Sequence, residues 1–201
     1  MEATARACFP RLIIKPPVMA VTQWMSWEGG VDLIAVTAPG LAMPNVIVHV
    51  ARMVHTPVGS APAGIVLWQP FPSNPPAVCG FVSTDPKVGA YFGPQIFAGT
   101  PFEHAPVLDA KIEITSGPDA CSARVEVAGH VFETSLTGLA PAELVQRAPI
   151  ATAPFTQQGL EAPAASAALK VNGQPVEIII PPVGITGGPC AVSAPCGVYA
   201  R

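Results

Sequence analysis

The chain has 201 residues, which suits one domain of ordinary size, and half of its residues are apolar, which excludes disorder by composition. Its 25 prolines and 18 glycines follow no period, so collagen is excluded and long uninterrupted helices are not expected. The formal net charge is −3 without a basic block, and nothing in the sequence indicates nucleic-acid binding.

The fraction of charged residues is low. Lys, Arg, Asp and Glu make up 11% of the chain, against about 25% in a typical soluble domain. Because charge keeps protein surfaces soluble and monomeric, we expect another subunit to cover part of this surface in a homo-oligomer. A surface rich in Ser, Thr, Gln and Pro would need no partner, and this alternative stays open.

The sequence offers no membrane or secretion signal. Met1–Pro10 contains no apolar segment of the kind that a signal peptide needs. Two long uncharged stretches, Met53–Thr84 and Ile178–Ala200, are interrupted by prolines and glycines, so neither can form a membrane-spanning helix. We therefore expect a cytoplasmic protein without a membrane partner.

Short β-branched runs bounded by Gly, Pro, Asn, Asp and Ser recur roughly every ten to fifteen residues, which is typical of strands. The predicted strands are 12–15, 18–27, 31–37, 45–56, 64–69, 77–83, 90–97, 107–115, 121–128, 131–137 and 176–180. Short helices are predicted over 141–147 and 163–170, because each segment begins with proline, and 148–162 is predicted as a loop. The pattern predicts one all-β (or β-rich α+β) domain over 1–201, an antiparallel sandwich or barrel of about eleven strands with two short connecting helices.

The predicted strand 45–56 carries two of the four histidines, the groups that titrate near neutral pH. On a straight strand His49 and His55 share one face with Met53, about 20 Å apart, too far to share a metal or a proton. We expect one of these histidines to lie at the end of an apolar pocket. The alternative is a hydrogen-bonded histidine in the core or at its rim. Arg52 stands among valines on the other face, where a guanidinium needs a carboxylate or an anionic ligand. Arg52, Met53 and His55 are therefore the candidate ligand-binding residues.

The segment 99–106 places an acid and an imidazole in a loop that is fixed by Pro101 and Pro106. Glu103 can orient an imidazole, or act as a general base if it is desolvated. It is not expected to pair with His104, because adjacent side chains of an extended segment point apart. His49, Glu103 and His104 are the candidate catalytic residues, and a rigid connection with two exposed polar side chains is the alternative for this loop.

The segment 107–137 predicts three consecutive antiparallel strands. Val107–Thr115 alternates apolar and polar residues, which indicates a strand with one solvated face. The next two predicted strands meet at a turn where Gly129 can supply a positive φ. Glu133 is then expected to face Arg124 or Glu126 on the neighbouring strand.

The five cysteines are odd in number, and in a reducing compartment we expect them to be buried apolar residues. Cys190 and Cys196 form the one close pair, whose spacing does not match a zinc knuckle; a disulfide or a metal remains an alternative. Phosphate-loop, Gly-x-Ser-x-Gly and His-Glu-x-x-His motifs are missing, so no metal site and no cofactor is predicted.

The run from Val78-Cys79-Gly80-Phe81 through Phe102-Glu103 and on to Leu139 resembles the middle of acetoacetate decarboxylase-like proteins. These are β-rich oligomers whose catalytic lysine forms a Schiff base in an apolar cavity, so the resemblance implies a lysine Schiff-base lyase as one alternative. Where that family has a lysine after a proline, this chain has Pro101-Phe102, and Lys111 belongs to the polar face of an alternating strand.

Two hypotheses of function follow. The first is a small-molecule-binding protein, or a metabolic enzyme, with a mostly apolar pocket and a His/Glu/Arg set that takes a small apolar or weakly anionic molecule. The second is a non-enzymatic structural or assembly subunit of a homo-oligomer.

Overall fold

A computed structural model describes residues 23–201, which form an all-β fold, as the sequence predicts. The strands are β1 (Trp24–Ala35), β2 (Val46–Thr56), β3 (Gly59–Trp68), β4 (Val78–Ser83), β5 (Val107–Ser116), β6 (Ala120–Val127), β7 (His130–Leu139), β8 (Glu143–Arg147), β9 (Thr156–Val171), β10 (Gln174–Val176) and β11 (Ala191–Ala200). The helical segments in this part of the chain are α1 (Pro86–Tyr91) and the π-helical turn η1 (Phe92–Ile96). No helix among the described residues is long and apolar enough to cross a membrane.

The strands form one hydrogen-bonded sheet that closes in a ring. Its order is β10-β9-β11-β1-β2-β3-β4-β5-β6-β7, and β7 pairs in turn with β9. The long strand β9 closes the ring, because its first half pairs with β11 and β8 while its second half pairs with β7 and β10. All pairings are antiparallel except β4–β5, whose parallel arrangement requires the crossover that contains α1 and η1.

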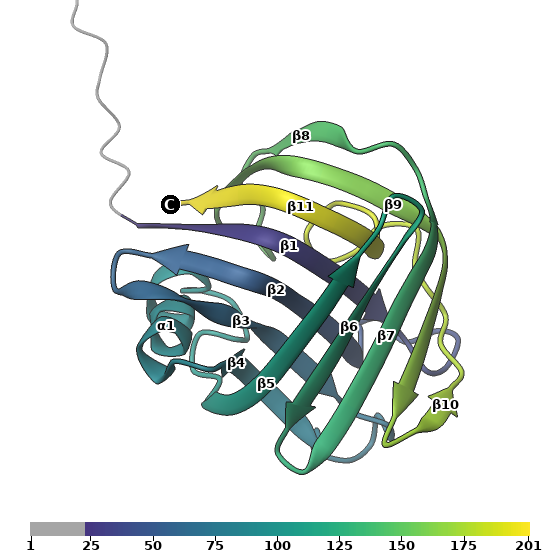
Figure 1. The fold of residues 1–201 in the computed structure, drawn as a ribbon. Helices are drawn as coiled ribbons and strands as arrows, with labels where there is room; N and C mark the ends of the chain where they lie inside the picture. Colours follow the sequence, from purple (N-terminus) through teal and green to yellow (C-terminus); the bar gives the residue numbers. More distant parts are fainter. Residues whose placement is uncertain (1–22) are drawn as a thin grey trace, which may run out of the picture.

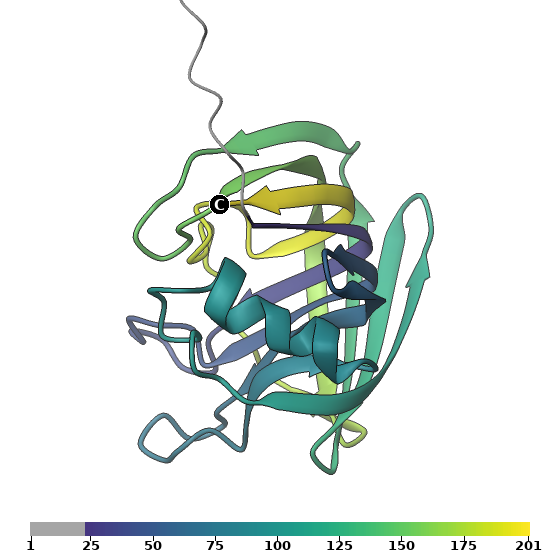
Figure 2. The ribbon, with the colours of Figure 1, turned by 90° about the vertical axis from the view of Figure 1, so that its left-hand side faces the viewer.

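Two cores lie on the two faces of strands β1–β4 (Figures 1 and 2). On one face, β5, β6, β7 and the second half of β9 cross these strands, and residues such as Leu33 and Val48 pack against Phe132 and Leu136. On the other face, α1 and η1 cover the sheet, so that Ile47 and Phe81 pack against Phe92. The side chains of Asp32 and His49 lie on the side of the second core.

A row of irregularities crosses β11, β1 and β2. Gly29 in β1 has φ +62°, a left-handed conformation that favours glycine. Next to it, β2 has one more residue than β3 between Ala51 and Val54, which is a β-bulge, and β11 has a similar bulge opposite β9. As a result Ala51 and Val54 both face the second core, although they are three positions apart and would face opposite sides of a regular strand.

The bulge corrects one sequence prediction. His49 and His55 do not share a face, because the extra residue in β2 reverses the alternation between them. The prediction assumed a straight strand. Likewise Arg52 does not belong to one apolar face with Val48 and Val54, which lie in different cores.

Both predicted helices are wrong. Residues 143–147 form strand β8, and 163–170 belong to β9, a segment predicted as loop and helix. Alanine favours a helix locally, but pairing with β7 overrides this preference, since Ala164, Ala167 and Ala168 all lie opposite β7 residues. The strand β11 was also not predicted.

The predicted strand 90–97 is wrong as well, because this segment lies in α1 and η1. Asp85 caps the helix by accepting a hydrogen bond from the backbone N–H of Lys87 at 2.8 Å, and Pro86 occupies the first turn. This start signal outweighs the apolar run that follows it.

Other strand predictions are confirmed with shifted bounds. Predicted strands 18–27 and 31–37 are one strand in the described residues, β1, and 176–180 contains only the end of β10 and an isolated bridge between Val36 and Ile179. The predicted strand 12–15 and the beginning of 18–27 lie outside the described residues. The three-strand segment is confirmed as β5, β6 and β7, with positive φ at Ala128 and Gly129 in the turn.

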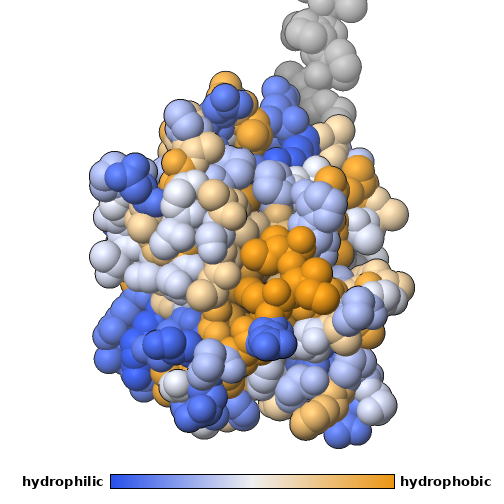
Figure 3. All heavy atoms as spheres, turned by 90° about the vertical axis from the view of Figure 1, so that its right-hand side faces the viewer, coloured by the Kyte–Doolittle hydropathy of each residue, from blue (hydrophilic) through white to orange (hydrophobic). Residues whose placement is uncertain are grey.

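The face that carries β10 and the segment after it shows an apolar area in its centre (Figure 3). Ile179 and Val183 of this segment are exposed to 46% and 63%. Val183 also lines a groove of about 250 Å³ together with Met43, which is itself exposed.

Candidate functional site

Two small adjoining chambers lie in the second core, between β1–β3 and the segments that cover them. The first chamber has a volume of about 20 Å³, and its apolar walls include Met25, Trp27, Ile65, Phe92 and Phe97. The second has about 30 Å³ and extends toward Phe102, Phe155 and Tyr199. Each volume holds a group about the size of a water molecule. His49, Ile65 and Phe97 line both chambers, so the histidine stands between them.

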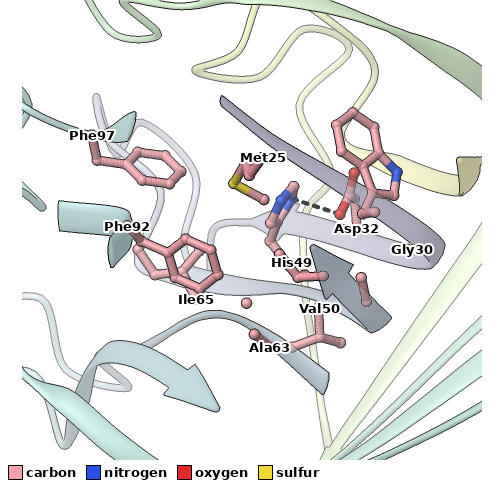
Figure 4. A pocket seen from close by; sticks show the side chains of 13 residues that line it. Met25, Gly30, Asp32, His49, Val50, Ala63, Ile65, Phe92 and Phe97 are labelled. Carbon is pink, nitrogen blue, oxygen red and sulfur yellow. Dashed lines mark ion pairs between the residues drawn. The ribbon is translucent and has the colours of Figure 1, made fainter. Parts of the chain in front are cut away.

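A His–Asp pair is the main polar feature of the first chamber. Asp32 of β1 and His49 of β2 are direct partners in the antiparallel register, and both point to the second core. The distance from His49 Nδ1 to Asp32 Oδ1 is 2.6 Å. Figure 4 shows this contact, with the other ring nitrogen on the side of Met25. The accessible fraction is 22% for the His49 side chain and 19% for that of Asp32, so water-sized molecules can reach the pair.

The environment raises the pKa of His49 above its usual 6.5. Burial by itself lowers this pKa, but the charge of Asp32, the hydrogen bond to Asp32 and the charge of Glu161 together raise it by more. Since the Asp32 carboxylate can only accept a hydrogen bond, Nδ1 carries the proton, and the lone pair of the neutral imidazole is on Nε2.

Tyr199 of β11 is the second polar group near His49. The two rings are stacked, with centroids 6.4 Å apart and an interplanar angle of 21°. Burial, followed by the charges of Asp32 and Glu161, raises the pKa of Tyr199 well above 10. Its hydroxyl is therefore protonated at neutral pH and can donate a hydrogen bond.

A buried ion pair lies beside this cluster. Arg147 of β8 binds Glu161 of β9 through two hydrogen bonds of 2.5 and 2.6 Å, and Gln157 donates a third bond of 2.7 Å to the same carboxylate. The hydrogen bond to Glu161 is the main cause that raises the pKa of Arg147. The pair holds β8 against β9, next to the segment with Thr152 and Phe155 that lines the second chamber.

Of the candidate residues on β2, His49 is the one whose side chain lines the chambers. Arg52 is exposed and packs over Gly29, while Met53 is half-buried. His55 faces away from His49; its Nδ1 lies 2.9 Å from Ser60 Oγ and its Nε2 lies 3.3 Å from Glu28 Oε1. The structure does not bring Arg52, Met53 and His55 together with His49.

The loop 99–106 contributes an apolar side chain to the second chamber rather than its acid or imidazole. Glu103 accepts a 2.6 Å hydrogen bond from the backbone N–H of Gly99, which closes the loop on itself. His104 is exposed, and Phe102 is the residue of this loop that lines the chamber.

The structure also places the cysteines and lysines. Cys190 is buried, Cys196 is exposed, and both are free, as are Cys79 and Cys121; Cys8 lies outside the described residues. None of the described lysines, which are Lys87, Lys111 and Lys170, lines either chamber. Residues 23–201 contain no group of three or more His, Cys, Asp or Glu side chains placed to hold a metal ion.

Four residues of the polar cluster are not among the candidates that the sequence predicts: Asp32, Arg147, Glu161 and Tyr199. Asp32 carried a usable signal, because it is a single acid within the apolar run Val31–Ala35. The other three lie in segments that were assigned to helix or loop, or to no strand. The comparisons add no further residue: a scan against protein-family models and searches of curated proteins and of solved structures found no match to this chain.

Proposed function

We propose that this protein binds a small, mostly apolar molecule with one hydrogen-bonding group in the two chambers, with His49 as the polar contact. The observation that carries the proposal is the 2.6 Å Asp32–His49 pair within walls of Met25, Phe92 and Phe97. Ligand sites are mostly apolar with a few polar groups at fixed positions, and this arrangement matches that description.

The size of the chambers limits the molecule to a few heavy atoms. Their volumes of about 20 and 30 Å³ adjoin at His49, so a short ligand could place its polar atom there and an apolar part on either side. The nearby carboxylates Asp32 and Glu161 disfavour a strongly anionic ligand, while a neutral molecule meets no such penalty.

The test is a screen of small neutral fragments (short alcohols, ketones, amides and hydrocarbons) by saturation-transfer NMR with the full chain. We expect binding of a subset of these fragments to the wild type, weakened at least tenfold in His49→Phe. Phe97 is partly buried and lines both chambers, so Phe97→Trp, with its larger ring, is expected to fill them and to weaken fragment binding as well. His130→Phe, at the start of β7, is the matched control and should bind as the wild type does. Failure of every fragment to bind would remove the proposal.

A second candidate function is self-association as an assembly subunit. It is supported by the low charge, 11% of residues, by the exposed side chains of Ile179 and Val183, and by the apolar area in Figure 3. Sedimentation velocity at several concentrations tests it, with Val183→Lys as the variant. We expect an oligomer that Val183→Lys dissociates; a wild-type monomer at all concentrations contradicts this candidate.

A further inference from the structure

We propose that the two chambers catalyse proton transfer at the carbon next to the carbonyl group of a small ketone, with His49 as the general base and Tyr199 as the hydrogen-bond donor to the carbonyl oxygen. This inference rests on the proposed function, because the ketone must first bind at His49. It adds the reaction type and the chemical class of the substrate.

His49 meets the requirements for a base. Asp32 fixes the Nδ1–H tautomer through the 2.6 Å contact, so the basic Nε2 is the nitrogen available to a molecule in the chambers. Burial lowers the pKa of His49, but the charge and hydrogen bond of Asp32 raise it by more, so the ring is a stronger base than a free imidazole. In this arrangement Asp32 is a positioning residue that holds the ring and its tautomer.

Tyr199 meets the requirements for the donor. Its ring stacks on His49 and both residues line the second chamber, so a carbonyl group placed in that chamber lies beside both the base and the phenol. The hydroxyl keeps its proton at neutral pH and can stabilise negative charge on an oxygen, and such an interaction is stronger in an apolar site than in water.

The lining of the chambers favours this reaction over covalent catalysis. The described residues that line them include no serine, cysteine or lysine side chain that could attack a substrate. Two threonines, Thr152 and Thr186, line the second chamber, and the Thr152 hydroxyl donates its proton to the carbonyl oxygen of Ile185 at 2.6 Å. A base and a neutral hydrogen-bond donor between apolar walls is instead suited to form an enolate and return the proton.

The step needs no further reactant. The Nε2 lone pair takes a proton from the α-carbon, and the electron pair of the broken C–H bond becomes the carbon–carbon π bond. The carbonyl π electrons move to oxygen, where the negative charge accepts the hydrogen bond from Tyr199. The imidazolium then returns a proton to carbon, or a deuteron after exchange with D₂O, and the original ketone is restored with its label.

The experiment measures deuterium incorporation into acetone and 2-butanone by ¹H NMR in D₂O, with the full chain and a buffer blank. We expect exchange above the blank for the wild type, a loss of about 100-fold or more in His49→Gln, and a loss of about 100-fold in Tyr199→Phe. The wild-type rate should rise with pH as His49 loses its proton. Asp32→Asn should lower the midpoint of that rise, a change that a purely structural role would not cause. His130→Gln is the matched control and should keep the wild-type rate.

Ketone binding is measured separately by saturation transfer, and circular dichroism checks the fold of each variant. If His49→Gln fails to fold, Tyr199→Phe, which removes one hydroxyl, decides the outcome. Ketones that bind without exchange above the blank overturn this inference and leave the proposed function intact. The inference is also overturned if ketones do not bind while other fragments do. If no fragment binds, both the proposed function and this inference are overturned.

Discussion

Gly64 of β3 lies directly against the backbone of His49. A Cβ atom at position 64 would be 2.0 Å from the His49 carbonyl oxygen and 2.7 Å from the Cα of Val50, distances that real Cβ contacts do not show. The absence of a side chain at this position lets β2 and β3 approach where His49 enters the chambers.

We therefore expect Gly64→Ala to lower the free energy of unfolding by about 2 to 3 kcal/mol, since the clash is with backbone and cannot be relieved by a rotamer change. Fragment binding should weaken with it, because His49 must move. Gly117→Ala is the control, as its nearest neighbour would be 3.4 Å away. Urea unfolding of both variants checks this, and equal stability of the two would contradict it.

The Arg147–Glu161 pair gives a second prediction. Arg147→Leu leaves Glu161, which is 6% exposed, without its cation. Removing one partner of a buried pair is costly, and because 20% of the Arg147 side chain is accessible we expect a loss of about 2 to 4 kcal/mol.

The double variant Arg147→Leu/Glu161→Leu separates the charge effect from lost packing. It is expected to recover much of the stability lost in Arg147→Leu, because no unpaired carboxylate remains. Chemical denaturation of the wild type, both single variants and the double variant measures this. A double variant less stable than either single variant would refute the explanation.

The raised pKa of His49 predicts a pH dependence of stability. Because the folded-state pKa lies above 6.5, the stabilising contribution is fully present below pH 6.5 and is lost as the pH rises through the folded-state pKa. The charges that act on His49 are those of Asp32 in β1 and Glu161 in β9, and Tyr199 of β11 stacks on its ring.

The measurement is the difference in unfolding free energy between the wild type and His49→Gln. We expect this difference to be larger at pH 6 than at pH 9. The trend should shrink when both proteins also carry Asp32→Asn, which removes the main charge that raises this pKa. A difference that grows with pH has the wrong sign for the proposed electrostatics.

Thr134 supplies a prediction outside the site. Its side chain is 1% exposed in the first core, and its hydroxyl oxygen has no hydrogen-bond partner among the described residues. Thr134→Val removes this unsatisfied group while keeping the shape, so we expect stability to rise by about 1 kcal/mol.

Thr56→Val is the matched control. The Thr56 hydroxyl donates to the Gly59 carbonyl at 2.9 Å and accepts from the Val58 N–H at 3.2 Å, so this substitution should destabilise by about 1 to 2 kcal/mol. Thermal and urea unfolding compare the two, and the same direction of change in both variants would count against this reasoning.

Local patterns predicted the part of the fold that depends on neighbouring residues. The alternation of 107–115 and the turn at Gly129 were sufficient for β5–β7, and the expected alignment of Arg124 with Glu133 is confirmed by the strand register. These features need no knowledge of distant strands.

The rest depends on pairing between distant segments. The alanine-rich half of β9 is a strand because β7 lies beside it, and no local signal reports that neighbour. The bulge at Arg52–Met53 has no signature in the residues themselves, so the face of His55 could not be deduced. His49 was found as a candidate, but its contacts with Asp32 and Tyr199 follow from the register of β1 with β2 and β11.

The pairing of β1 with β11 has a consequence for refolding. Trp24 lies opposite Ala200, and Gln23 and Arg201 exchange backbone hydrogen bonds. The first and the last of the described residues therefore lie next to each other in one sheet. The strands that supply Asp32 and Tyr199 are therefore among the pairs with the largest loop to close, and such contacts form slowly. Recovery of fragment binding after dilution from urea should lag behind recovery of the far-UV circular dichroism signal, and would report completion of the last long-range pairing.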